Sequence, residues 1–133
     1  MIKNSLEFED RERLLDWLYA LEECDMKDEI VLKTVRSYIH SDDNDVKQIA
    51  IMRLGCRAHD IQIKQFLIEI LEAKVSAASS DEILVYSAAV NALVCLAYAH
   101  DFKRELSDRL MKLHADETVG EKITYLQAAL KDL

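Results

Sequence analysis

One pattern of apolar residues occurs twice in this chain, at a spacing close to 40 residues. Each copy precedes the tripeptide Ala-His-Asp, which lies at residues 58–60 and again at 99–101. Self-similarity at this period is typical of stacked helix pairs, because a single pair cannot bury its own apolar face. The repeat therefore predicts an α-solenoid. The two copies, 39 residues apart, are Val46, Ala50 and Leu54, and Val85, Ala89 and Leu93.

The residues that break helices are almost missing. The 133 residues include no proline and two glycines, Gly55 and Gly120. Proline and glycine are the least favourable residues in a helix interior and are favoured in turns. We therefore expect an all-α chain that forms one domain over residues 1–133.

Start and stop signals divide the chain into seven expected helices, arranged as three antiparallel pairs and a closing helix. Capping-box spacing marks three of the starts, at residues 4–7, 79–82 and 118–121. The third helix is expected over about residues 45–54, with Gly55 as a left-handed terminator. Asp60 and Asp101 are expected to cap the fourth and sixth helices, and residues 114–116 are expected to form a turn.

The segment 42–55, DDNDVKQIAIMRLG, resembles the first helix of a HEAT repeat. Acids precede Val46-Lys47, an alanine lies four residues after the valine, and a leucine lies eight after it. The resemblance extends over about residues 42–113, although the proline usual in the family is missing and Tyr86 stands where a base is common. It implies a right-handed α-solenoid of about three antiparallel helix pairs plus a closing helix.

The charge of the chain is negative and unevenly placed. The formal net charge is −8, and residues 7–29 hold ten acids against three bases. An acidic chain without a basic run does not gain the counterion-release energy that drives binding to nucleic acid. The same charge argues against anionic membrane surfaces. We expect neither as a partner.

Residues 83–99 form an uncharged run of 17 residues. The run is shorter than the roughly 20 apolar residues that span a bilayer. It also includes Tyr86, Ser87, Asn91 and Tyr98. We therefore predict a central helix surrounded by others and no membrane span.

The three cysteines, Cys24, Cys56 and Cys95, form no CxxC pair, and the N-terminus does not resemble a secretory leader. We interpret them as reduced, largely structural thiols in a cytoplasmic protein. Neither a metal nor a cofactor is expected.

The four histidines, His40, His59, His100 and His114, are each expected at a turn between helices. In a solenoid, His59 and His100 would be neighbours along one edge, about 10 Å apart. That separation is too large for shared metal ligation, in which each bond is about 2 Å. We expect structural or surface roles for all four.

Catalytic motifs are also missing. No nucleophile elbow, phosphate-binding glycine loop or HExxH motif occurs. The paired carboxylates are expected at helix starts or on solvated faces, where their pKa values would not be tuned for acid–base catalysis. The chain is therefore not expected to be an enzyme.

The acidic N-terminal third has two interpretations. It is either a solvated face that keeps the protein soluble or a docking surface for a basic partner, with aromatic anchors among the acids. Trp17 would then be an anchor, beside Tyr19 and Tyr38, or else a plug that caps the first repeat. The predicted partner-binding residues are Trp17, Glu22, Glu23, Asp28 and Glu29.

The sequence thus favours a non-catalytic protein–protein interaction module. An acidic inhibitor or immunity-type protein that neutralises a basic toxin or nuclease is one specific form. The alternative is a structural or assembly subunit, such as a homo-oligomeric scaffold, which exposed side chains of Leu126, Leu130 and Leu133 would favour. An enzyme or a nucleic-acid binder is less favoured, since similarity of fold does not establish function.

Overall fold

The computed structural model describes residues 8–73, 80–116 and 120–133. Within these ranges the regular structure is entirely helical, with seven α-helices, two 3₁₀ turns and no strand. The expected all-α class is confirmed. The elements are α1 (Arg11–Ala20), η1 (Asp25–Lys27), α2 (Glu29–Tyr38), α3 (Asn44–Cys56), η2 (Ile61–Ile63), α4 (Lys64–Glu72), α5 (Ser80–His100), α6 (Lys103–Asp116) and α7 (Gly120–Asp132).

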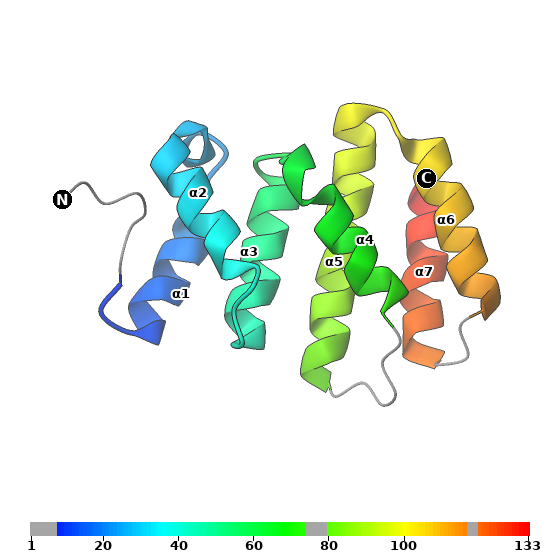
Figure 1. Cartoon of the computed structure of the whole chain (residues 1–133), viewed down its shortest axis with the longest axis horizontal. Helices are drawn as coiled ribbons and strands as arrows, with labels where there is room; N and C mark the ends of the chain where they lie inside the picture. The colour runs from blue at the N-terminus through cyan, green and yellow to red at the C-terminus, as the bar shows by residue number, and fades with distance from the viewer. Residues whose placement is uncertain (1–7, 74–79, 117–119) are drawn as a thin grey trace.

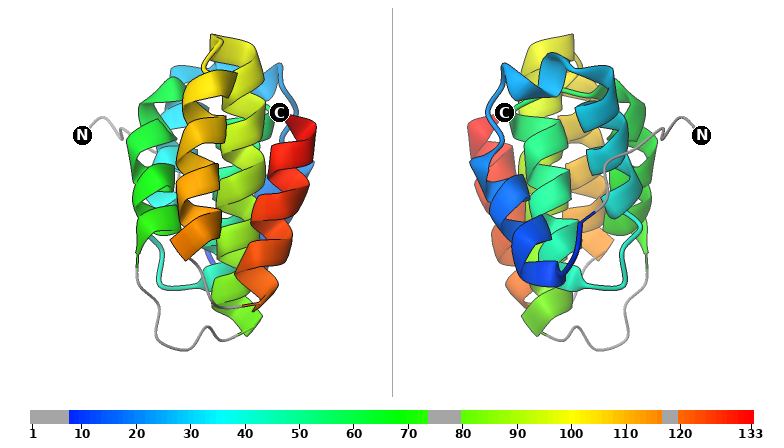
Figure 2. Two further views of the ribbon diagram at one scale, coloured as in Figure 1. Left: turned by 90° about the vertical axis from the view of Figure 1, so that its right-hand side faces the viewer. Right: turned by 90° about the vertical axis from the view of Figure 1, so that its left-hand side faces the viewer.

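The helices follow one another along the long axis of the molecule in two layers (Figures 1 and 2). One layer contains α1, α3, α5 and α7, and each of these helices contacts the next one in the layer. The other layer contains α2, α4 and α6, which pack against the first. The contact between α3 and α5 is the most extensive of all.

Helix α5 occupies the centre and contacts α3, α4, α6 and α7. Residues 82–100 are long and apolar enough to cross a membrane by length and composition alone, but 56% of the stretch is buried inside the fold. Leu84 and Tyr98 are its exposed large side chains, and the Tyr98 hydroxyl donates a hydrogen bond to the Asp132 carbonyl of α7. The helix therefore packs as a core element, as predicted.

The repeated apolar residues form the centre of one hydrophobic core. Ala50, Leu54, Ala89 and Leu93 are completely buried, and the two valines of the pattern are nearly so. This core continues from α1 to α7 without a break. The repeat thus identifies the residues through which α3 and α5 pack.

Aspartates begin several of the helices. Asp10, Asp28 and Asp43 precede α1, α2 and α3, and each accepts hydrogen bonds from backbone N–H groups of the first turn. Asp60 caps η2, which leads directly into α4, whereas Ile63 precedes α4 itself and provides no side-chain cap; the predicted aspartate therefore caps the 3₁₀ turn before the fourth helix. These contacts satisfy N–H groups that have no partner within the helix. The three expected capping boxes each include a residue outside the described ranges, at positions 4, 7, 79 and 118.

Gly55 does not terminate α3, contrary to the prediction. The helix continues to Cys56, and no glycine described has a positive φ. A Cβ at position 55 would lie 2.3 Å from the Cβ of Ala92. Glycine is therefore needed here because α3 and α5 approach closely, and not because the chain turns.

Two other predicted turns differ from the structure. Residues 114–116 belong to the last turn of α6. Asp101 has a φ of 58° and ends α5, while α6 begins two residues later, so Asp101 is not adjacent to the helix that it was predicted to cap. At the end of α5, the N–H of Phe102 donates to the Ala97 carbonyl at 3.1 Å, so a local backbone hydrogen bond closes this helix.

Candidate functional site

The predicted partner-binding residues lie where α1 leads into α2. Two buried side chains, Leu21 and Met26, anchor the connector between α1 and α2 in the hydrophobic core. Between and after these anchors the chain presents polar side chains to solvent. In Figure 1 this connector lies at one end of the helix bundle, above α1.

We call the carboxylates of Glu22, Glu23, Asp25, Asp28 and Glu29 the acidic end. All five residues are exposed, and residues 22–29 include one base, Lys27. Among the residues described, none of the five forms an ion pair.

Two of the five carboxylates also organise the connector. An Asp25 oxygen accepts a hydrogen bond from the backbone N–H of Glu22 at 2.9 Å. Asp28 Oδ1 accepts from the N–H groups of Ile30 and Val31 at 2.8 and 3.3 Å, which caps α2. Asp28 is thus the N-cap residue of α2, and it remains exposed to solvent.

The described ion pairs elsewhere join separate elements of the fold, with one local pair near the start of α1. Arg36 on α2 holds Asp60, whose side chain is only 5% exposed, with its Nε at 2.5 Å from Oδ2. Lys64 on α4 pairs with Glu105 on α6 at 3.2 Å. The remaining pairs are Arg11 with Asp43 and Asp45, Arg109 with Glu72, and Arg13 with Glu9.

Trp17 is half-buried and packs against the core. Its ring centroid lies 4.8 Å from that of Phe8, and the ring of Tyr38 lies 6.3 Å from the same phenylalanine. These two aromatic side chains therefore pack against the ring of Phe8. The arrangement resembles the predicted plug more than a free anchor.

Two exposed apolar side chains flank the acidic end in sequence. Tyr19 is 63% exposed on the last turn of α1, and Ile30 is 47% exposed on the first turn of α2. The sequence pointed to Tyr19 beside Trp17, but it did not point to Ile30. The signal for Ile30 was its place on the first turn of α2, directly after the acids that begin this helix.

The histidines do not form a common site. His100 Nε2 lies 2.7 Å from the carbonyl oxygen of His59, so the two Ala-His-Asp turns are neighbours, as expected, and are joined by the His100 side chain. His59 itself has a φ of 49°. His114 lies within α6, and its buried Nε2 has no hydrogen-bond partner among the described residues. No group of three or more potential metal ligands occurs in the part of the chain described.

Cys56 and Cys95 lie side by side, which was not predicted from the sequence. Their Sγ atoms are 3.1 Å apart, across the contact between α3 and α5. Both are free thiols and half-buried, whereas Cys24 is exposed. Their separation of 39 residues equals the repeat spacing, and this was the signal that could have placed them together.

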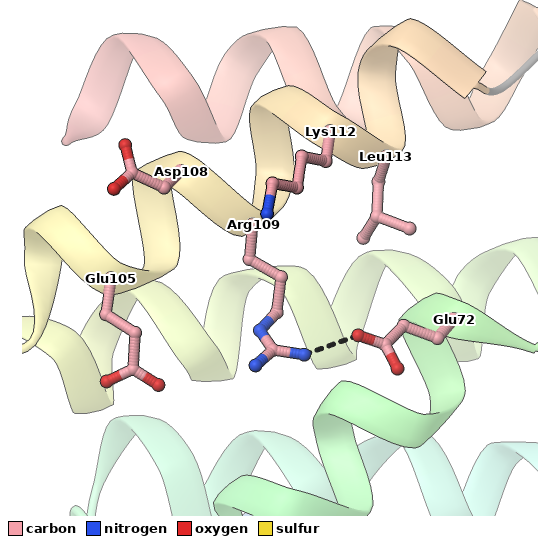
Figure 3. Close-up of a pocket in the computed structure, with 6 residues that line it drawn as sticks. All are labelled: Glu72, Glu105, Asp108, Arg109, Lys112 and Leu113. Carbon is pink, nitrogen blue, oxygen red and sulfur yellow. Dashed lines mark hydrogen bonds and ion pairs between the residues drawn. The ribbon is translucent and has the colours of Figure 1, made fainter.

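A groove of about 470 Å³ lies between α4 and α6 (Figure 3). Arg109 reaches from α6 toward Glu72 on α4, and Glu105, Asp108 and Lys112 also line it. Among the described residues that line it, Leu113 is the apolar one. Small-molecule sites are lined mainly by apolar and aromatic groups, so this groove does not have the character of one.

A smaller and more apolar pocket, of about 230 Å³, lies where α3, α4, α5 and α7 meet. Its walls include Ile70, Val85 and Tyr86. Lys122 is only 3% exposed there, and its Nζ lies 5.1 Å from the centroid of the Tyr86 ring. A cation over an aromatic face is a stable arrangement, so the lysine has a structural role in this wall.

No family model matches this chain, and neither a curated protein nor a solved structure matches it.

Proposed function

We propose that this chain is a non-catalytic protein–protein interaction module whose acidic end docks a basic protein. The observation that carries the proposal is the clustering of five exposed carboxylates within residues 22–29, none of which forms an ion pair among the residues described. Several carboxylates elsewhere, such as Asp43, Asp60 and Glu105, are paired with bases. An inhibitor or immunity-type protein directed at a basic toxin or nuclease is the specific form that we favour.

The physical argument has two parts. Unpaired, exposed charge of one sign accelerates association with a partner of the opposite sign and aligns it. Exposed aromatic and aliphatic side chains supply the buried contacts that hold such a complex together. Tyr19 and Ile30, next to the acids at the end of α1 and the start of α2, are the exposed apolar residues available for this role.

The proposed architecture is a HEAT-like right-handed α-solenoid of three antiparallel helix pairs and a closing helix. The burial of equivalent repeat residues in α3 and α5 supports it, as does the succession of α1, α3, α5 and α7 in one layer. In such an array the end surface belongs to one terminal pair. A partner could therefore bind the acidic end without disturbing the remaining helices.

The last helix, α7, gives little support to the alternative that this chain is a homo-oligomeric scaffold. Leu126 is completely buried, and Leu130 and Leu133 are half-buried against the core. The apolar face on which that alternative depended is therefore largely covered within the chain. Size-exclusion chromatography with light scattering tests it directly, because a scaffold would self-associate.

The test of the proposed function is capture of partners from the native lysate at low and at high salt, with identification by mass spectrometry. We expect a basic protein that is retained at low salt and weakened at high salt. The acidic-end variant, E22Q/E23Q/D28N/E29Q, should lose that capture. Asn at position 28 keeps a good N-cap residue, so the variant should remain folded.

The matched control removes the same number of charges elsewhere. Asp42, Glu69, Asp108 and Asp132 are exposed and have no ion pair among the described residues. The variant D42N/E69Q/D108N/D132N should therefore capture the same protein as the wild type. Equal loss in both variants would show that net charge, and not the acidic end, determines binding.

A further inference from the structure

The pair formed by Cys56 and Cys95 is close to the geometry of a covalent bond. The two Sγ atoms are 3.1 Å apart, and a disulfide bond is about 2.05 Å long. The two helices approach each other closely next to this point, where Gly55 faces Ala92. A movement of about 1 Å would therefore bring the sulfurs to bonding distance.

We propose that Cys56 and Cys95 form a dithiol site that a low-molecular-weight disulfide, such as oxidised glutathione, converts reversibly into an intramolecular disulfide between α3 and α5. The site is independent of the acidic end. It would covalently join the two copies of the repeat at equivalent positions.

The reaction is thiol–disulfide exchange in two steps. One protein thiolate attacks a sulfur of oxidised glutathione, whose S–S bond breaks and releases the first glutathione thiolate. The second protein thiolate then attacks the protein sulfur of the mixed disulfide and releases the second glutathione. Two electrons pass from the cysteine pair to oxidised glutathione, and the two thiol protons end on the two reduced glutathione molecules. Reduced glutathione reverses both steps.

The surroundings of the pair affect the rate of this exchange. Burial, and then the hydrogen bond with Cys95, raise the pKa of Cys56 to about 12, and the nearby charges of Arg57 and Arg53 lower it only in part. The thiolate is the attacking form. We therefore expect slow exchange at neutral pH and faster exchange in mildly alkaline buffer, whereas the exposed Cys24 would react first.

The cross-link should stabilise the fold. The native helices are already in contact, so little strain is added, while the unfolded chain is constrained by a loop that encloses one whole repeat. The oxidised protein should consequently unfold at a higher temperature than the reduced protein.

The test uses the full chain with C24S, which removes the exposed thiol. The variant is equilibrated in mildly alkaline glutathione buffers of increasing oxidised fraction, trapped with N-ethylmaleimide and weighed intact. We expect a species that has lost two hydrogen atoms and takes up no N-ethylmaleimide. We also expect its thermal unfolding midpoint to exceed that of the reduced form.

The single-thiol controls C24S/C56S and C24S/C95S should take up one glutathione each. The proposal would be overturned if C24S accumulated only mixed disulfides, or if it remained reduced while the same chain oxidised in urea. An oxidised form less stable than the reduced form would also overturn it. These readouts on C24S decide the matter even if a control variant does not fold.

Discussion

Gly55 of α3 lies against Ala92 of α5 so closely that a Cβ added to the glycine would be 2.3 Å from the alanine Cβ and 2.8 Å from its Cα. Non-bonded carbon atoms do not approach each other this closely. The Cα of Ala92 belongs to the backbone and cannot rotate away from the added methyl group. The most extensive helix contact of the fold thus depends on the absence of one methyl group.

The substitution Gly55→Ala should therefore destabilise the protein, although alanine is the better helix former by about 1 kcal/mol. Forcing the two helices apart in a packed core costs typically about 1–3 kcal/mol. After the gain in helix propensity is subtracted, we expect a net loss of about 1 kcal/mol. Urea unfolding followed by circular dichroism measures it. The double variant G55A/A92G should recover part of the loss, because the clash with the side chain at position 92 is removed and the clash with its backbone remains. An unchanged or increased stability of G55A would contradict the close approach.

The ion pair of Arg36 and Asp60 should contribute more to stability than the exposed pairs. Asp60 is nearly buried and also caps η2, so Arg36→Met would leave a buried carboxylate without its counter-charge. We expect a loss of about 3 kcal/mol in the free energy of unfolding. Arg13→Met, which breaks the exposed pair with Glu9, should change stability by less than about 1 kcal/mol. Equal effects of the two substitutions would be inconsistent with the burial of Asp60.

The pair of Arg11 and Asp43 predicts a particular pH dependence. The hydrogen bond from Arg11 lowers the pKa of Asp43, and the N–H groups of Val46 and Asp45 lower it further. Asp43 therefore contributes stability above its unfolded pKa of about 3.9, and this contribution is lost as the pH falls through the lower pKa of the folded state.

The comparison that isolates this effect is wild type against Asp43→Asn, which keeps the helix cap and cannot ionise. The difference between their free energies of unfolding should be constant above about pH 5. It should shrink below about pH 4. Urea titrations across this range measure it, and a difference that stayed constant into strong acid would argue against the pair.

The repeat pattern was sufficient to predict the helical class and the buried residues of α3 and α5. Local sequence signals, such as a glycine that marks a helix end, were less reliable where contacts between helices determine which residue is required. Gly55 carries the signal of a helix end, but α3 continues through it because Ala92 requires its small size. The spacing of Cys56 and Cys95 contained the information that they are neighbours, whereas the partial burial of Trp17 depends on its contact with Phe8.

Arg53 should hold α1 in place. Its Nε and one terminal nitrogen donate hydrogen bonds to the carbonyl oxygens of Leu18 and Tyr19 in the last turn of α1, at 2.9 and 3.0 Å. The Leu18 carbonyl also accepts from the N–H of Leu21 at 3.4 Å, so Arg53 adds to the capping of this helix end. Arg53→Met should lower stability by about 2 kcal/mol, because hydrogen bonds from a charged donor are lost. Hydrogen exchange should accelerate in α1 more than in α5. The control Arg57→Met, at an exposed position nearby, should change stability by about 0.5 kcal/mol or less.

The most direct test of the proposed docking surface is the affinity of the captured basic protein for three forms of this chain, measured by titration calorimetry at low and physiological salt. We predict that E22Q/E23Q/D28N/E29Q binds at least about tenfold more weakly than the wild type, which corresponds to about 1.4 kcal/mol. We also predict that D42N/E69Q/D108N/D132N binds as the wild type does. Equal affinities of the wild type and the acidic-end variant would contradict the assignment of the acidic end as the docking surface.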